Sequence, residues 1–557
     1  MKRREFLASC AALGVAACTG RKATPPLPPG ILSGSGFARG HQLRPEQKNT
    51  LPPKPDEIRR IPVLIVGGGI AGLSAGWRLQ RAGFNDFLIA DLEDRVGGNS
   101  RYSENAISRY PLGAHYLPLP GPEARAVRAM LADFGILQGD PQALHPTYDE
   151  RYLCATPQER LFRRGAWQEG LLPAPTDATE QKKIAEFQRR IDHLRQQRDS
   201  QGRRAFAIPM EYSSRDPALL ALDRITFATW LRREGLECPA LRWYLDYASR
   251  DDFGTGIDAV SAWAGLHYFC CRDGEAQNAS NDIVLTAPEG NGWLVRRLEE
   301  RLQSNLQCGS IATALHPQKQ DITVDLWQPE KQHRLRIEAE QVIWAAPLFI
   351  LAHAWPDAPD TVRRAAQSFN YAPWLVANLS LNEHPRTRTG APLAWDNVLF
   401  EGQGLGYVVA THQQIRVRPA ATVITYYHAF GNPDSRTTRQ QLLARPREYW
   451  AHEIFNELAI AHPELREITT QFDIFRHGHA MIRPLPGLLW SAQSPRQALC
   501  DEARWGWGRL QLAHADLSGM SLFEEANYRG VKAAERVLGA LGILNMSGGH
   551  GHDHALT

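Results

Sequence analysis

The chain combines stretches without apolar periodicity and stretches whose apolar residues recur at strand or helix spacing. Residues 61–66 form a continuous apolar run that ends in a glycine cluster, and residues 70–81 then carry apolar side chains at helical spacing. This order predicts a buried strand, a tight turn and a helix. A second apolar run, residues 87–90, ends in Asp91 and predicts the next parallel strand. The pattern is typical of an α/β fold.

Further elements are expected between and after these segments. Residues 176–200 place Ile184, Phe187, Ile191 and Leu194 on one helical face, and residues 256–271 are apolar nearly all round, as in a buried helix. Thr226 is a plausible cap for a helix that stops at Gly235. Strand-like runs lie at residues 322–327, 341–344, 375–381 and 422–427. A chain of 557 residues exceeds what one core usually supports, so two domains are expected.

The N-terminus has the features of an export signal. A basic start precedes the apolar run Phe6–Ala17, which is shorter than the ~20 residues that span a bilayer. Arg3 and Arg4 resemble a twin-arginine signal, and the residues up to Cys18 resemble a lipobox. We therefore expect residues 1–17 to be a signal peptide read by the twin-arginine export machinery, and a periplasmic protein held to a membrane by a lipid on Cys18. A poorly ordered amphipathic N-terminus is the alternative. The proline-rich residues 18–60 predict an extended tether.

Charge and cysteine usage narrow the function classes. The net charge is +3, of which Lys2, Arg3, Arg4 and Glu5 contribute +2, so the mature chain is near +1 and lacks the charge of a nucleic-acid binder. Of the eight cysteines, Cys10 lies in the signal and Cys18 would carry the lipid, and the other six form no C-x-x-C pair, which favours free thiols and no metal site. Residues 546–557 are a histidine-rich tail in which His550, His552 and His554 could bind a metal weakly, but a polar tail is favoured.

The glycine cluster points to a bound dinucleotide. Gly67, Gly69 and Gly72 have the spacing in which the first glycine permits a tight turn, the second lets the backbone approach a pyrophosphate, and the third lets helix and strand pack closely. Free N–H groups at the start of the helix, from Ile70 and Ala71, would face the phosphates. Asp91, 19 residues after Gly72, is placed to accept hydrogen bonds from ribose hydroxyls.

The run from Asp91 to Gly98 resembles the acid-x-x-x-Arg-x-Gly-Gly motif of the flavin-containing amine oxidase and phytoene desaturase superfamily. Further motifs of that superfamily are resembled by Pro111–His115, the helix-like run from Pro288, the strand pair ending at Pro347 and residues 508–538. The resemblance implies a Rossmann-like, GR2-type FAD-binding domain assembled from residues 61–120, 288–347 and 501–545. It also implies an α+β substrate domain built from two inserts, residues 121–287 and 348–500.

The resemblance also implies the cofactor and its binding residues. FAD would be non-covalent, because no cysteine or histidine lies in an attachment motif of the superfamily. Asp516 would bind ribityl or pyrophosphate oxygens, and the N–H groups from Leu522 to Glu524 would face the flavin pyrimidine. The full expected set is Gly67, Gly69, Ile70, Ala71, Gly72, Asp91, Leu92, Arg95, Gly97, Gly98, Asn99, Gly113, Ala114, His115, Ala312, Asp516, Leu522 and Phe523.

The chain departs from the superfamily pattern on the substrate side. Ala377 aligns with the lysine that is often water-bridged to flavin N5, and Asn99 replaces an arginine. Met520, Ser521 and Leu522 are not aromatic, although an aromatic residue commonly stands near there. These departures predict slow reaction of the reduced flavin with oxygen, because no cation stabilises the charge that forms as oxygen accepts electrons.

The expected activity is hydride transfer to flavin N5 from an amine-type small-molecule substrate. The alternatives are a desaturase or isomerase acting on an apolar, polyene-like substrate, and a flavin-holding protein without turnover. His479, Arg483 and His115 are the candidates for a catalytic or positioning role. Asp251 and Asp252 could hold a cationic amine, or could be helix-capping and surface acids.

Overall fold

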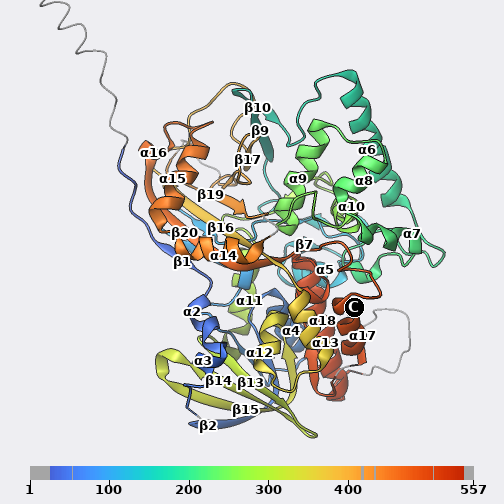
Figure 1. Ribbon diagram of the computed structural model, residues 1–557, viewed down its shortest axis with the longest axis vertical. Coiled ribbons are helices and arrows are strands. Elements are labelled where there is room, and N and C mark those ends of the chain that lie inside the picture. The colour runs from blue at the N-terminus through green and yellow to red at the C-terminus, as the bar shows by residue number, and fades with distance from the viewer. Residues whose placement is uncertain (1–24, 53, 415–419, 432–433, 506, 545–557) are drawn as a thin grey trace, which may run out of the picture.

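The computed structural model describes residues 25–544 except 53, 415–419, 432–433 and 506. Two large sheets, each flanked by helices, lie one above the other (Figure 1). The expected signal peptide, the lipid site at Cys18 and the histidine-rich tail lie outside the described residues. None of the helices in the described ranges is both long and apolar enough to cross a bilayer.

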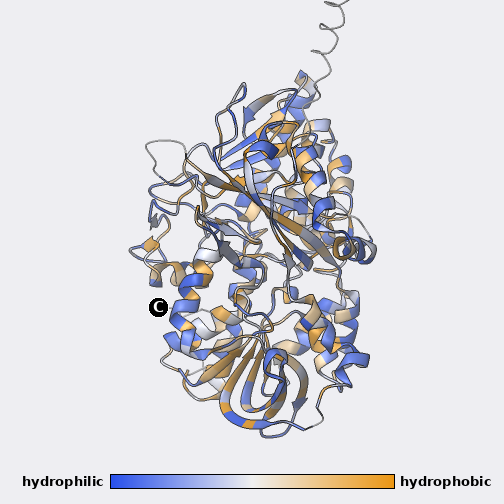
Figure 2. Ribbon diagram, turned by 90° about the vertical axis from the view of Figure 1, so that its left-hand side faces the viewer, coloured by the Kyte–Doolittle hydropathy of each residue, from blue (hydrophilic) through white to orange (hydrophobic). Residues whose placement is uncertain are grey.

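The lower sheet has seven strands in the order β12-β3-β2-β15-β14-β13, and β21 pairs with β15. The predicted strand at residues 61–66 is confirmed as part of β2 (Glu57–Val66), and the one at residues 87–90 is β3 (Phe87–Ala90). Figure 2 shows the apolar character of these strands. The other strands are β12 (Leu306–Gln307), β13 (Ile311–Pro317), β14 (Ile322–Gln328), β15 (His333–Trp344) and β21 (Leu510–Leu512).

Helices cover both faces of this lower sheet. Three helices from the expected FAD-binding segments pack on it, namely α4 (Ile70–Arg81), α11 (Gly292–Leu302) and α18 (Phe523–Ala540). Three shorter helices that we assigned to the substrate inserts also pack in the cores of this domain, namely α5 (Arg125–Asp133), α12 (Leu348–Ala354) and α13 (Asp360–Ser368). So does α17 (Pro495–Trp505). The expected boundaries are thus corrected here, because gaps between motifs do not reveal which sheet a helix covers.

The upper sheet has eight strands in the order β1-β20-β16-β19-β18-β17-β9-β10. The predicted strands at residues 375–381 and 422–427 lie within β16 (Tyr371–Leu381) and β19 (Thr422–Ala429). The remaining strands are β9 (Glu159–Arg163), β10 (Ala166–Glu169), β17 (Asp396–Leu399), β18 (Tyr407–Val409) and β20 (Thr469–Ile482). Helices α14 (Ser435–Ala444), α15 (Arg447–Leu458) and α16 (Leu465–Ile468) pack against one face.

A group of helices stands beside the upper sheet (Figure 1). The predicted helix over residues 176–200 is α6 (Ala178–Gln196), which begins after Asp177 because that carboxylate accepts hydrogen bonds from the N–H groups of Thr179 and Glu180. Thr226 caps α8 (Phe227–Arg233) as expected. The other two helices are α9 (Pro239–Phe253) and α10 (Ala262–Cys271), and α10 is almost entirely buried. The six cysteines of the described ranges are free thiols, as predicted.

The segment expected to be a tether is structured from residue 32 onward. Leu32–Gly34 form β1, which pairs in parallel with β20, and α2 (Phe37–Gly40) and α3 (Pro45–Lys48) follow. The extended-tether prediction is therefore wrong for these residues. Elements of three or four residues are held by backbone pairing and a few anchors, so they leave no apolar periodicity in the sequence. Residues 18–24 lie outside the described residues.

Candidate active site

The glycine turn between β2 and α4 has the geometry that its spacing predicts. Gly67 has φ +107°, and a Cβ there would lie 2.6 Å from the backbone nitrogen of Ala346. A Cβ on Gly72 would lie 1.8 Å from the carbonyl oxygen of Gly67, so helix and strand could not pack. In contrast, a Cβ on Gly69 would meet only the Cα of Gly98, at 3.9 Å. Gly69 therefore borders open space at the N-terminus of α4, as a pyrophosphate requires.

Asp91 holds the loop that follows β3. Its carboxylate accepts hydrogen bonds from the N–H of Gly68 at 2.5 Å and from the N–H of Glu93 at 2.8 Å. Burial raises the pKa of Asp91 to about 6, although both hydrogen bonds favour the ionised form. We expected this carboxylate to serve ribose hydroxyls, and each oxygen retains a further lone pair for that purpose.

The neighbouring loop residues connect the two halves of the expected flavin site. Gly97 and Gly98 have φ +121° and +56°, which favour glycine. The carbonyl oxygen of Asn99 accepts a hydrogen bond from the N–H of Ala114 at 2.8 Å, and its side-chain amide donates to the carbonyl of Ala480 on β20. A Cβ on Gly113 would lie 2.1 Å from the Asn99 oxygen, so the turn at Gly113 fits only glycine.

Three other expected cofactor residues lie around this loop. Arg95 is exposed, and its guanidinium donates to the Tyr102 hydroxyl at 2.9 Å. Leu92 is half-buried and packs against the core that contains Ile311, next to Ala312 on β13. Both Leu92 and Ala312 lie at the end of the lower sheet where the resemblance places the adenine.

The motif near the C-terminus contributes a buried carboxylate. Asp516 Oδ2 accepts hydrogen bonds from the N–H of Leu348 at 2.9 Å and the Tyr371 hydroxyl at 2.7 Å. Burial opposes ionisation of Asp516, but His514 and the donated hydrogen bonds outweigh it, so its pKa lies below its ordinary value. Asp516 Oδ1 is buried and has no hydrogen-bond partner within the described ranges. An ionised oxygen in that state fits a hydroxyl donor such as a ribityl group. The contact of Asp516 with ribityl or pyrophosphate oxygens stays a prediction.

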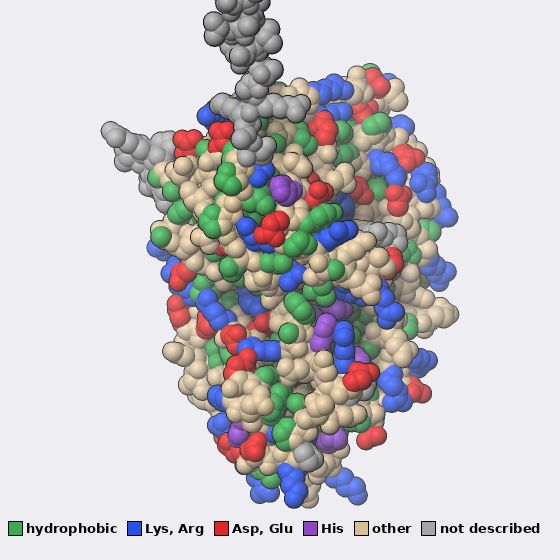
Figure 3. All heavy atoms as spheres, turned by 60° about the vertical axis from the view of Figure 1, so that its left-hand side comes forward, with side chains coloured by type: hydrophobic (Ala, Val, Ile, Leu, Met, Phe, Trp, Pro, Cys, Tyr) green, Lys and Arg blue, Asp and Glu red, His purple; other side chains and the backbone are tan. Residues whose placement is uncertain are grey.

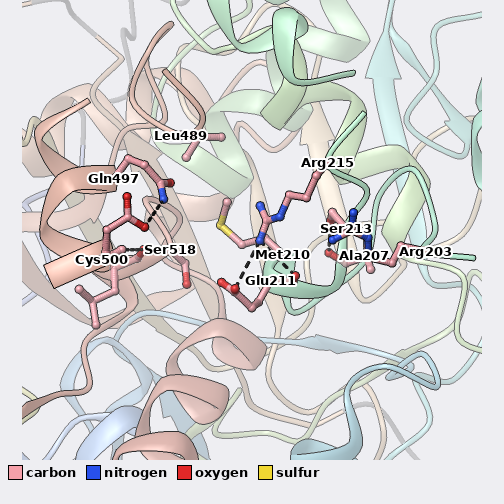
Figure 4. Close-up of polar contacts among 12 residues, drawn as sticks. Arg203, Ala207, Met210, Glu211, Ser213, Arg215, Leu489, Gln497, Cys500 and Ser518 are labelled. Carbon is pink, nitrogen blue, oxygen red and sulfur yellow. Dashed lines mark hydrogen bonds and ion pairs between the residues drawn. The ribbon is translucent and has the colours of Figure 1, made fainter. Parts of the chain in front are cut away.

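Helix α18 begins beside Asp516, with Leu522 as its cap residue and Phe523 as its first residue. Two buried contacts fix this end, since Glu525 accepts hydrogen bonds from the N–H of Met210 at 2.6 Å and from the Ser518 hydroxyl at 2.6 Å. Figure 4 shows Met210 and Ser518 approaching each other from the helical group and from the lower domain. The free N–H groups at the start of α18 are thereby held in a fixed place, as binding of the flavin pyrimidine requires.

Aromatic side chains gather next to the Gly113–Ala114 turn. The ring of His115 stacks on Tyr427 with centroids 4.4 Å apart and lies 5.6 Å from the ring of Trp395. Tyr116 makes an edge contact with His115 at 5.1 Å. Burial lowers the pKa of His115 to about 3, so this ring is neutral at physiological pH.

Carboxylates from three separate elements lie near one another here, and we call them the acidic cluster: Asp251 on α9 and Asp396 on β17, which both raise the pKa of Tyr427, and Glu159 on β9, which acts on Asp396. Asp251 accepts a hydrogen bond from the Tyr116 hydroxyl at 3.1 Å, and Asp396 accepts one from the Tyr247 hydroxyl at 3.4 Å. All three are half-buried rather than sealed. Burial, reinforced by repulsion from Asp252, raises the pKa of Asp251 to about 6. Burial, reinforced by repulsion from Asp251 and Glu159, raises the pKa of Asp396 well above its ordinary value. The pKa of Glu159 rises to about 7, mainly through burial.

Two arginines act on Asp251, and both are already engaged: Arg250 pairs with Asp246 at 3.0 Å. Arg272 pairs with Asp252, donates to the Tyr116 hydroxyl at 2.9 Å and stacks over the Tyr268 ring at 4.0 Å. Asp252 is therefore a structural partner, whereas Asp251 belongs to the cluster. Sequence reasoning found Asp251 but missed Asp396, Glu159 and Tyr427, because nothing local in the sequence marks them.

The three catalytic candidates do not lie together. His115 borders the acidic cluster, whereas His479 is exposed and stacks on Phe349 at 4.7 Å, on the side of the lower domain. Arg483 is buried and donates to the Thr255 hydroxyl at 2.5 Å and to Asn370. We therefore retain only His115 as a candidate for direct contact with a substrate.

The structure also corrects the residue expected at the lysine position. Ala377 packs with Leu375 and Leu379 against α14 and α15, on the face of the upper sheet that lies away from the site. Trp374 and Val376 point to the opposite face and share a core with Tyr427 and Trp395. Because side chains alternate along a strand, an alignment shift of one residue changes the face. The residues that face the site still include no lysine at this place.

These features define a two-domain flavoprotein. The lower domain carries the dinucleotide-binding turn and the ionised Asp516 carboxylate, and the upper domain contributes the aromatic and acidic groups. Residues 70–538 match the family described as flavin containing amine oxidoreductase. The chain belongs to this family, and its cofactor is FAD.

Known relatives support the same fold. Polyamine oxidases 7 and 6 of rice (Oryza sativa subsp. japonica) are 40% and 42% identical over 55 residues, about a tenth of this chain, and the match spans only 12% and 11% of their own lengths. Putrescine oxidase bound to putrescine superposes with a TM-score of 0.61 at 15% identity, covering 86% of this chain and all of the other. Cyclohexylamine oxidase from Brevibacterium oxydans IH-35A gives a TM-score of 0.61 at 14% identity, with 86% and 99% covered. A fatty acid isomerase from P. acnes gives 0.58 at 16% identity, with 86% and 98% covered.

Proposed function

We propose that this protein is an FAD-dependent oxidoreductase that oxidises an aliphatic amine carrying a second cationic group. The observation that carries the proposal is the acidic cluster beside the aromatic rings at the Gly113–Ala114 turn. Three half-buried carboxylates produce a net negative environment, because the two neighbouring arginines, Arg250 and Arg272, are already paired with other aspartates. A cation replaces part of the hydration that these carboxylates lose on burial, so the site favours ammonium groups.

Each group has a distinct task in this proposal. Bound FAD supplies the acceptor at N5 for the hydride that leaves the carbon next to the reacting nitrogen. Asp251, Asp396 and Glu159 hold the distal ammonium group and thereby position the substrate. The stacked rings of His115 and Tyr427 offer one apolar surface to the hydrocarbon part of the substrate, and neutral His115 adds no positive charge that would repel the amine.

Amino acids are less suitable substrates than diamines. A carboxylate needs a cationic partner, and Arg272 is committed to Asp252 and Tyr116. The putrescine complex among the structural relatives supports a diamine as the first compound to test. Because a fatty acid isomerase is among the structural relatives, an apolar substrate is the alternative. The buried carboxylates oppose the binding of a polyene, because they would lose hydration without gaining a polar partner. A flavin-holding protein without turnover is the third candidate.

The proposal also covers the cellular location of the protein and the electron acceptor of the reduced flavin. Export by the twin-arginine route, a lipid on Cys18 and non-covalent FAD remain our interpretation of the sequence. We also propose that oxygen is a poor acceptor, because neither Trp374 nor Val376 supplies the positive charge that a lysine would. Stopped-flow reoxidation in air against a quinone tests this, and fast reoxidation with stoichiometric peroxide would contradict it.

The deciding experiment is anaerobic flavin bleaching by a panel of compounds. Putrescine and longer diamines should bleach the flavin, cyclohexylamine should do so less efficiently, and amino acids and conjugated fatty acids should not. Conversion of a fatty acid without net bleaching would favour the isomerase. A flavin that no compound reduces would favour the binding protein.

A further inference from the structure

Residues 28–51, which we call the strap, run along the outside of both domains before the lower sheet begins. In Figure 1 the strap follows the edge of the molecule from β20 down to α2 and α3. Figure 3 shows this side of the molecule, where Lys and Arg side chains are interspersed with Asp and Glu. The family match begins only at residue 70, so the strap lies outside it.

The upper part of the strap pairs with the edge of the upper sheet. Leu32, Ser33 and Gly34 align with Ile474, Phe475 and Arg476 of β20. Hydrogen bonds from the N–H of Phe472 to Pro29 at 2.8 Å and from the N–H of Ile474 to Ile31 at 2.9 Å extend the pairing. A Cβ on Gly30 would lie 1.8 Å from the Phe472 carbonyl oxygen, so the strap lies directly on the β20 backbone.

The lower part of the strap is bound to the loop after Asp91. The N–H of Gly36 donates to Glu93 at 2.8 Å, and Arg39 donates to the carbonyl of Leu92 at 3.0 Å and pairs with Asp94 at 2.8 Å. Leu43 is 4% exposed and packs against Ile311 and Trp327, in the same cluster as Leu92. The strap thus covers the loop and strand on which Leu92 and Ala312 lie.

A third set of contacts reaches the flavin turn. The Ser35 hydroxyl lies 3.2 Å from Nδ1 of His477 and accepts a hydrogen bond from Arg101 at 3.2 Å. Nε2 of His477 lies 2.6 Å from the carbonyl oxygen of Leu112, the residue before Gly113. Burial lowers the pKa of His477 to about 4, so the ring is neutral and donates one hydrogen bond and accepts the other.

We propose that the strap is a clamp for the cofactor: it joins the Leu92–Asp94 loop, the Leu112–Gly113 turn and β20, and FAD leaves only after the strap has detached. The topology gives an order of events. Ile31 and Asp473, which are hydrogen-bonded, are 442 residues apart, so the strap docks only after most of the chain has folded. The clamp therefore closes last, over a cofactor that has already entered.

Two engineered variants test the clamp in opposite directions, with FAD release measured by the recovery of free-flavin fluorescence after dilution of the full-length holoprotein. The double variant Arg39→Ala/Leu43→Ala should release FAD about tenfold faster, the change expected if ~1.4 kcal/mol of contact is lost. Lys48→Ala is the matched control, because Lys48 also lies on the strap, and its side chain donates a hydrogen bond to the carbonyl of His353, which belongs to none of the three segments that the clamp joins. Its release rate should equal that of the wild type.

The variant Ile31→Cys/Asp473→Cys tests the opposite direction by comparing its oxidised and reduced states, since the substitution itself removes the hydrogen bond from the N–H of Ile31 to Asp473. The two positions are neighbours directly before the β1–β20 pair, so oxidation should fasten the strap and slow FAD release several-fold relative to the reduced variant, and a reductant should reverse the change. Equal release rates in the oxidised and reduced states, or FAD that stays attached after denaturation, would overturn the clamp. Amine oxidation does not enter these measurements, so they are independent of the proposed function.

Discussion

The FAD site and the acidic cluster are built in different ways, and the difference determines what the sequence could predict. The FAD site recognises its ligand mainly through backbone, so its glycines stand close together in the chain and leave a local signature. The acidic cluster recognises a ligand through side chains on α9, β17 and β9, which only the folded upper domain brings together. A site that binds its ligand through the backbone can therefore be predicted from local sequence, whereas a site built from side chains on distant elements cannot.

The largest effect is expected where the backbone itself meets the cofactor. Gly69→Val should abolish FAD binding, because a side chain there would fill the space that borders Gly98 and the start of α4. Absorbance at flavin wavelengths after gel filtration measures this. Gly121→Ala is the control, since a Cβ there would make only ordinary contacts, the nearest at 3.6 Å. A yellow Gly69→Val protein would mean that the pyrophosphate does not approach this turn.

This contrast explains which predictions succeeded. The strands, α4, α6 and α8 followed from periodicity and capping, because these signals are local. The helices α12 and α13 were assigned to the wrong domain, since an amphipathic helix does not specify which sheet it covers. Ala377 was placed one residue out of phase with the site, and in a strand one residue reverses the face. The strap left no recognisable pattern in the sequence, because pairing through the backbone does not require particular side chains.

The next largest effect concerns substrate recognition. Asp396→Asn should lower kcat/KM for putrescine by about 30-fold or more, the range for losing one partner of a buried charge pair. It should change kcat/KM for cyclohexylamine much less, because that substrate has no second cation. Asp258→Asn is the control, since Asp258 is exposed and pairs with Arg242. An equal loss for both amines would indicate a structural role for Asp396.

A smaller effect should appear in the pH profile. The raised pKa of Asp251, about 6, and of Glu159, about 7, reflects burial first, so both carboxyls gain protons as the pH falls through this range. The site then loses negative charge, and kcat/KM for a diamine should fall below pH ~7, which reports the free enzyme. Asp251→Asn should flatten the profile. A profile that stays level from pH 8 to pH 5 would exclude these carboxyls from substrate binding.

The smallest effect is on stability, and it has the opposite sign to the effect on binding. Since the folded state raises the pKa of Asp251 from 3.8 to about 6, ionisation of this group opposes folding. The penalty is absent below pH ~4, grows as the pH rises through the interval and is complete above pH ~6. In Asp251→Asn the side-chain oxygen can still accept the Tyr116 hydrogen bond, but the side chain cannot ionise.

At pH 8 the variant should therefore have a free energy of unfolding higher than that of the wild type by an amount of order 1 kcal/mol, and it should unfold at a higher temperature. This gain should shrink toward pH 4.5. Thermal unfolding of the FAD-saturated protein at the two pH values measures it, with Asp258→Asn for comparison. If the variant gains stability at pH 8 and loses affinity for the diamine, the burial of Asp251 serves binding at the expense of stability. If the variant gains no stability at pH 8, Asp251 is an ordinary structural acid.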